Sequence, residues 1–134
     1  MDVRDLESRL TELLDHVNRE AGYPLSLVCT EQGLLVASAG EQLQSEVAAG
    51  LTSLFDDIVV RAVRDLGFAR VDEFTLVDST GLRYVVRPLP AEHDTRLFLV
   101  VAVPRKTSWR RHTNKLVGQV SELMRPLVAA GSAA

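Results

Sequence analysis

Apolar residues recur along the chain at two spacings, and the spacing separates helices from strands. A helical spacing predicts helices over residues 3–21, over 41–66 and after Thr107 or Ser108, either of which can cap the last helix. Short alternating or continuous apolar runs predict strands at 25–30, 34–39, 71–77, 82–87 and 97–103. The predicted order is helix, two strands, helix, three strands, helix.

Two of the strand segments indicate their places in the sheet. Residues 97–103 are apolar at every position, which is typical of a central strand covered on both faces. Residues 71–77 include Asp72 and Glu73, so we expect an edge strand there. Helices on both faces are needed to bury the central strand. The pattern therefore predicts a three-layer α/β (α+β) sandwich as a single domain over residues 1–128, with a frayed tail at 129–134.

The helix at 43–66 is apolar over an unusually wide part of its surface. Its apolar arc spans roughly 160–200°, whereas a helix that lies on one core needs about 100°. One stripe consists of Leu43, Val47, Leu51, Leu54, Ile58 and Ala62, and a second group continues it with Ala48, Phe55, Val59, Val63 and Leu66. We therefore expect part of this helix to contact something beyond its own sheet.

Composition excludes several classes of protein. With 134 residues, 46% of them hydrophobic and 25% charged, the chain fits one globular domain rather than a disordered segment. The longest apolar runs are far below the roughly 18 residues of a membrane-spanning helix. The N-terminus shows no basic region followed by an apolar stretch, and the single cysteine cannot form an internal disulfide. We therefore expect a cytoplasmic protein.

Charge is distributed unevenly along the chain. Residues 1–94 hold 8 arginines against 17 acids, a net charge of −9, whereas residues 95–134 carry +6. The densest positive stretch consists of Arg105, Lys106, Arg110, Arg111 and Lys115. It is compatible with an acidic protein partner or with a plain solvated face. Nucleic acid is less well supported, because the sequence pI is about 5.6 and exposed aromatic residues are not expected.

Candidate catalytic and metal-binding residues are few. His16, His93 and His112 have no carboxylate or cysteine at metal-ligand spacing, and Cys29 lies mid-strand, where a buried structural role is expected. A phosphate-binding glycine loop with its lysine is absent from the sequence. We therefore expect no enzymatic activity, no cofactor and no metal.

Two acidic sequences look like sites but have simpler explanations. Asp56 and Asp57 are adjacent in a predicted helix, so they point about 100° apart and do not share a site. We interpret both as part of a solvated helix face. The sequence Asp78-Ser79-Thr80-Gly81 is explained as a hairpin turn.

The element order and two local sequences resemble the roadblock / dynein-light-chain family, which includes many small bacterial partners of Ras-like GTPases. The best matches are the hairpin LSLVCTEQGLLVAS at 25–38 and the long helix at 43–66 that follows it, and the resemblance covers about residues 5–127. It implies a five-stranded antiparallel sheet of profilin/longin-like outline, with the middle helix on one face and the terminal helices on the other. The chain departs from the commonest bacterial pattern in its basic stretch at 105–115 and its longer loop at 88–96.

The resemblance also implies how the protein acts. Family members form homodimers or heterodimers in which middle helices pack antiparallel and edge strands join. They serve as scaffolds or activators of small GTPases, often without donating a catalytic arginine. We therefore expect a dimer interface at Ala48, Leu51, Phe55, Val59, Val63, Phe74 and Leu76. Independently of the resemblance, the concentration of positive charge leads us to expect partner contacts at the basic stretch. The alternatives are a purely structural adaptor that recruits other roadblock proteins, or a profilin- or PAS-like small-molecule sensor.

Overall fold

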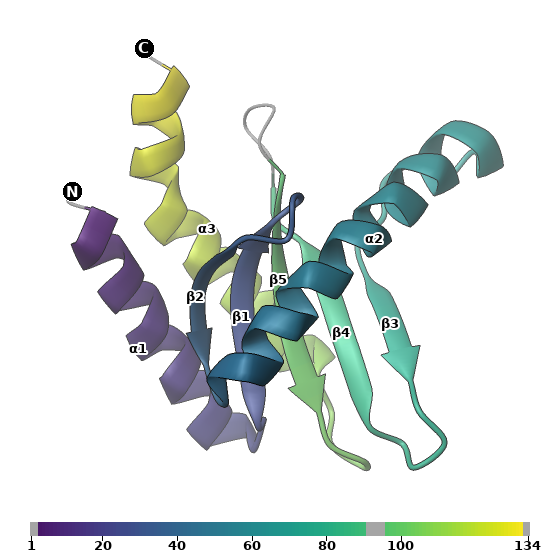
Figure 1. Ribbon diagram of the computed structural model, residues 1–134, viewed down its shortest axis with the longest axis horizontal. Helices are drawn as coiled ribbons and strands as arrows, with labels where there is room; N and C mark the ends of the chain where they lie inside the picture. The colour runs from purple at the N-terminus through teal and green to yellow at the C-terminus, as the bar shows by residue number, and fades with distance from the viewer. Residues whose placement is uncertain (1–2, 91–95, 133–134) are drawn as a thin grey trace.

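The computed structural model describes residues 3–90 and 96–132, and the side chains of residues 4–90 and 96–125 (Figure 1). The elements are α1 (Val3–Ala21), β1 (Leu25–Thr30), β2 (Leu35–Ala39), α2 (Gln42–Leu66), β3 (Phe74–Val77), β4 (Arg83–Pro88), β5 (Leu97–Val103) and α3 (Arg110–Ser132). The order predicted from the sequence is confirmed.

The five strands form one antiparallel sheet in the order β2-β1-β5-β4-β3. Strand β5 lies in the middle, where Val100 is paired with Leu27 of β1 and Val101 with Val85 of β4. Strands β2 and β3 form the two edges. The central position predicted for residues 97–103 and the edge position predicted for the segment at 71–77 are both confirmed.

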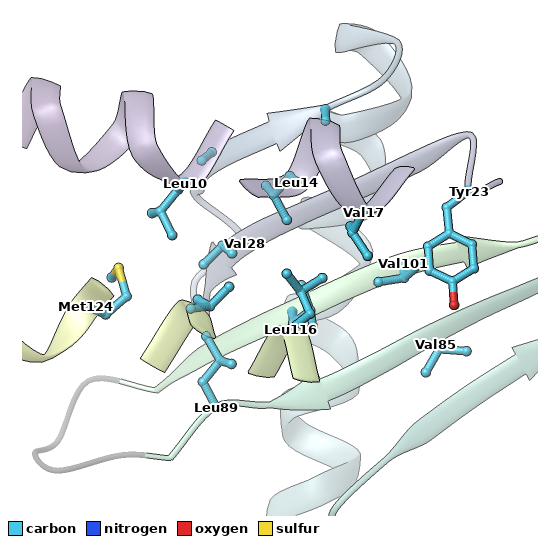
Figure 2. Close-up of a cluster of buried hydrophobic side chains, with 14 of the residues drawn as sticks. Leu10, Leu14, Val17, Tyr23, Val28, Val85, Leu89, Val101, Leu116 and Met124 are labelled. Carbon is cyan, nitrogen blue, oxygen red and sulfur yellow. The ribbon is translucent and has the colours of Figure 1, made fainter. Parts of the chain in front are cut away.

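Helices α1 and α3 cover one face of this sheet and α2 crosses the other (Figure 1). On the first face, leucines of α1 and α3 pack on alternate residues of the strands; Figure 2 shows Leu10, Leu14 and Leu116 around Val28 and Val101. All five are at most 1% exposed. Full burial of a leucine or valine stabilises the fold by roughly 1.5–3 kcal/mol, so this layer holds the terminal helices in place.

The layer beneath α2 is built differently. The sheet contributes large residues such as Phe98 and Val100, whereas α2 contributes the small residues Ala48 and Ala49. Small side chains let the helix lie close to the sheet. The close approach extends to the β1–β2 turn: a side chain at Gly33, whose φ is +83°, would come within 3.1 Å of the Ala49 carbonyl.

Several element boundaries differ from those predicted, most clearly those of β3 and α3. Strand β3 begins at Phe74 rather than 71, because the preceding residues are held by side chains: Arg87 Nε donates to the Asp72 carbonyl at 2.8 Å and Trp109 Nε1 donates to Glu73 at 2.9 Å. Helix α3 begins at Arg110, so Trp109 precedes it. The helix continues to Ser132, and the tail expected at 129–134 is therefore helical as far as its backbone is described.

Candidate interaction surfaces

Helix α2 presents a stripe of large apolar side chains to solvent. Its members are Leu43, Val47, Leu51, Leu54 and Ile58, and each is between 46% and 66% exposed. We call these five residues the α2 stripe. The side of the helix that faces the sheet carries small or polar residues instead: Ser45, Ala48, Ala49, Thr52 and Asp56 are buried. Monomeric proteins rarely expose contiguous apolar surface of this kind without a binding role.

An apolar groove of about 340 Å³ separates the α2 stripe from the strands beside it. Leu51 and Phe55 line its helix side, and Leu76 and Tyr84 line its strand side. The rings of Phe55 and Phe74 stack below, with centroids 4.6 Å apart. The groove therefore makes α2 and the β3 edge one continuous surface.

Strand β3 adds an unpaired backbone edge to this surface. Its only neighbour in the sheet, as far as the structure is described, is β4, so the outer N–H and C=O groups of Phe74–Val77 have no ladder partner. Leu76 and Val77 are each 53% exposed on this edge. An exposed apolar edge strand is a template for pairing with another chain.

The expected interface residues divide into three groups in the structure. Leu51, Val63 and Leu76 are exposed; Phe55, Val59 and Phe74 are half-buried; and Ala48 is buried at the floor of the groove. The exposed flank of α2 also includes Leu43, Val47, Leu54 and Ile58, which were absent from that expectation. The sequence contained the signal, because these four residues belong to the first apolar stripe of the helix.

Comparison with solved structures gives high similarity at low sequence identity. MglB of Myxococcus xanthus matches with a TM-score of 0.78 and 17% identity over 90% of this chain and 91% of that chain. The gliding protein MglB from Thermus thermophilus matches with a TM-score of 0.76 and 16% identity, over 90% of this chain and 92% of that chain. A roadblock/LC7 domain from Streptomyces avermitilis matches with a TM-score of 0.67 and 13% identity, over 89% of this chain and 97% of that chain. This chain has the roadblock fold. No family model matches the sequence, and no curated protein matches it significantly.

Within this roadblock fold the predicted basic stretch does not form one surface. Arg105 lies against Gly81 of the β3–β4 turn, and Arg110 lies over the Trp109 ring. Arg111 and Lys115 instead line a hollow together with Glu20 and His112, on the side of α3 that faces α1. Lys106 is exposed in the turn before α3. None of the five cations forms an ion pair with a residue that the structure describes.

Asp56 corrects one interpretation made from the sequence. Its carboxylate faces the sheet rather than solvent, and it accepts two hydrogen bonds from Arg96, at 2.9 and 2.7 Å. Arg96 also pairs with Glu31 of the β1–β2 turn at 2.8 Å. The hydrogen bond to Asp56 raises the pKa of Arg96 above its ordinary value. This cluster fastens the middle of α2 to the start of β5, whereas Asp57 is exposed as expected.

Of the remaining candidate residues, Cys29 and His112 occupy structural positions. Cys29 is fully buried, and burial raises the pKa of its thiol to about 11, which disfavours the nucleophilic thiolate. His16 lies 3.0 Å from Glu20 on α1, His112 packs edge-on against Tyr23, and His93 lies outside the described residues. Among the described residues, no three His, Cys, Asp or Glu side chains are grouped as they would be around a metal. No described helix is long and apolar enough to cross a membrane.

Proposed function

We propose that this protein is a homodimeric, non-enzymatic regulator or scaffold of a Ras-like small GTPase. The observation that carries the proposal is the unpartnered apolar surface formed by the α2 stripe and the β3 edge, on a fold shared with MglB and with a roadblock/LC7 domain. The resemblance of the hairpin and long helix to the roadblock family supplies the class of partner.

A second copy of the chain is the occupant that fits the α2 stripe best. Leu43 and Ile58 lie at equal distances from the peptide between Gly50 and Leu51, and Val47 and Leu54 do so as well. Two such helices running antiparallel about a twofold axis at that peptide would place Leu43 against Ile58 and Val47 against Leu54. An isologous interface requires this kind of self-complementarity.

Gly50 marks the centre of the proposed helix pairing. It is exposed, and a Cβ added there would meet nothing within 4 Å in the protomer. Glycine lowers helix stability relative to alanine, so its presence mid-helix is explained if two helices cross closely at that point. The unpaired β3 edge, continuous with the stripe through the groove, would join its counterpart across the same axis.

The small-molecule sensor is supported less well by this surface. A ligand pocket needs a few polar groups to orient its ligand, whereas the groove is lined by apolar side chains apart from Gln44, Thr52 and Tyr84, and it opens along the α2 stripe. An elongated apolar groove beside an exposed helix fits a second helix.

The test uses the GTPase encoded nearest to this chain in its genome, loaded with GDP or with a non-hydrolysable GTP analogue. We expect binding that differs between the two nucleotide states, measured by calorimetry, and no hydrolysis by the purified chain alone. Binding to neither state refutes the proposal, as does saturable nucleotide turnover by the chain. Binding without any change in GTP hydrolysis assigns the scaffold role, and accelerated hydrolysis assigns the activator role.

A further inference from the structure

A second candidate interaction surface surrounds Trp109, on the opposite side of the sheet from α2. The guanidinium carbons of Arg83 and Arg110 lie 4.9 and 5.2 Å from the centroid of the Trp109 ring. Arg105 and Lys106 lie in the turn that leads to this tryptophan. We call Arg83, Arg105, Lys106, Trp109 and Arg110 the Trp109 corner.

The cations of this corner lack anionic partners. None of them forms an ion pair with a described residue, and Nη1 of Arg83 is buried without a hydrogen-bond partner among those same residues. A buried donor is normally satisfied, but nothing in the described chain offsets the charge of this guanidinium beside the Trp109 ring.

The neighbouring acids are already engaged. Glu73 accepts hydrogen bonds from Trp109 Nε1 at 2.9 Å and from the Thr75 hydroxyl at 3.0 Å. Asp78, in the β3–β4 turn, accepts from the backbone and hydroxyl of Thr80, and these bonds lower the pKa of its carboxyl. Four cations against two acids leave the corner with a net positive charge.

Two of these positive residues, Lys106 and Arg110, stand where they destabilise the local backbone. Lys106 has a φ of 62°, a left-handed conformation that favours glycine, in a turn closed by the hydrogen bond from Thr107 N–H to the Pro104 carbonyl. Helix α3 then begins with two arginines and no acid in its first turn. Positive side chains at the positive end of a helix dipole destabilise it, and the same end attracts an anion.

We propose that the Trp109 corner binds a carboxylate-rich segment of a partner protein. Arginine guanidinium groups present paired N–H donors that match a carboxylate, and the tryptophan ring supplies an apolar floor. Val85, on the same strand as Arg83, packs under α1 and α3, whereas Tyr84 between them faces α2. Because successive residues of a strand face opposite sides of the sheet, Arg83 lies on the α3 side. The Trp109 corner therefore stays open when a second copy of the chain covers the α2 stripe. This inference holds whether or not the partner is a GTPase.

Trp109 is the only tryptophan in the chain and reports directly on this corner. We expect hexaglutamate peptide to change its fluorescence saturably in low salt, and hexaserine to leave it unchanged. Raising salt to about 0.5 M should weaken the peptide's binding, because exposed charges are screened. The variant Arg83→Gln with Arg110→Gln should weaken it by about tenfold or more.

The matched control is Arg111→Gln with Lys115→Gln. It removes the same charge from the same stretch, but these residues lie on the α1 side of α3. We expect its peptide affinity to stay within about twofold of wild type. Equal weakening by both double variants overturns the proposal, since it indicates general attraction to the basic region. Inorganic phosphate that binds as tightly as the peptide overturns it as well. Arg110→Gln alone changes an exposed side chain, so it tests the corner even if a variant at Arg83 fails to fold.

Discussion

Replacing Gly50 by alanine should have opposite effects on the protomer and on the dimer. In the protomer the new methyl group meets nothing within 4 Å, and alanine is about 0.8–1.0 kcal/mol more favourable than glycine in a helix interior. In the proposed dimer the two methyl groups face each other where the helices cross. Overpacking of a close contact costs about 1–3 kcal/mol, which corresponds to a dimer dissociation constant raised by roughly 5- to 150-fold.

Gly118→Ala is the matched control for this substitution. Gly118 is also an exposed glycine within a helix, and a Cβ there also meets nothing within 4 Å, but it lies on α3, away from the α2 stripe. We expect both variants to gain helix stability and only Gly50→Ala to lose dimer affinity. Sedimentation velocity from nanomolar to micromolar protein concentration measures the dimer affinity. Thermal unfolding at a low concentration, where the chain is monomeric, measures the gain in helix stability.

Two results would refute this reasoning. If Gly50→Ala dimerises as tightly as Gly118→Ala, the helices do not meet closely at Gly50. If the wild-type chain is monomeric at micromolar concentration, the α2 stripe is not an interface between copies. A single cysteine tests the register separately: Leu51→Cys should cross-link to its counterpart near the axis, whereas Leu43→Cys should not, because the two copies of that position would lie about 22 Å apart.

Three further predictions concern single residues. Asp56→Asn should lower the free energy of unfolding in urea by about 1–3 kcal/mol, because it breaks a partly buried pair with Arg96; exposed Asp57→Asn should cost less than about 0.5 kcal/mol. Because the pKa of Cys29 rises to about 11 on folding, the unfolded chain loses this proton first. Stability should therefore fall between about pH 9 and 11, by up to roughly 2–3 kcal/mol, and Cys29→Ala should reduce that fall in urea titrations. Lys106→Gly should stabilise the turn by about 1 kcal/mol in thermal unfolding, because its φ is 62°.

Hydrophobic spacing predicted the layers because the apolar positions of each strand and helix indicate which of its faces are buried. Residues 97–103 form the middle strand β5, and a strand buried on both faces must be apolar throughout. The wide arc of the helix at 43–66 likewise indicated an additional contact. Spacing alone could not decide which flank of α2 faces the sheet. Large residues are usually assigned to the core, yet here Ala48 and Ala49 face the sheet and the five large residues of the α2 stripe face outward.

The polar clusters could not be predicted, because their members come from distant parts of the chain. Asp56 resembles its neighbour Asp57 in sequence, and only the fold brings Arg96 to it from the start of β5. Arg83 lies outside the basic stretch, on β4, but the fold places it over the same ring as Arg110. A charge count along the sequence groups residues by proximity in the chain, whereas a binding surface groups them by the faces of helices and strands.

The two proposed surfaces can be occupied at the same time. The α2 stripe and its groove lie on the α2 face of the sheet, and the Trp109 corner lies on the face that α1 and α3 cover. In a twofold dimer joined at α2 and β3, each copy would keep its own corner accessible, so two acidic segments could bind one dimer. Loss of the dimer in a variant at Gly50 should then leave the hexaglutamate affinity per chain unchanged. A large decrease in that affinity would show instead that the second copy contributes to the corner.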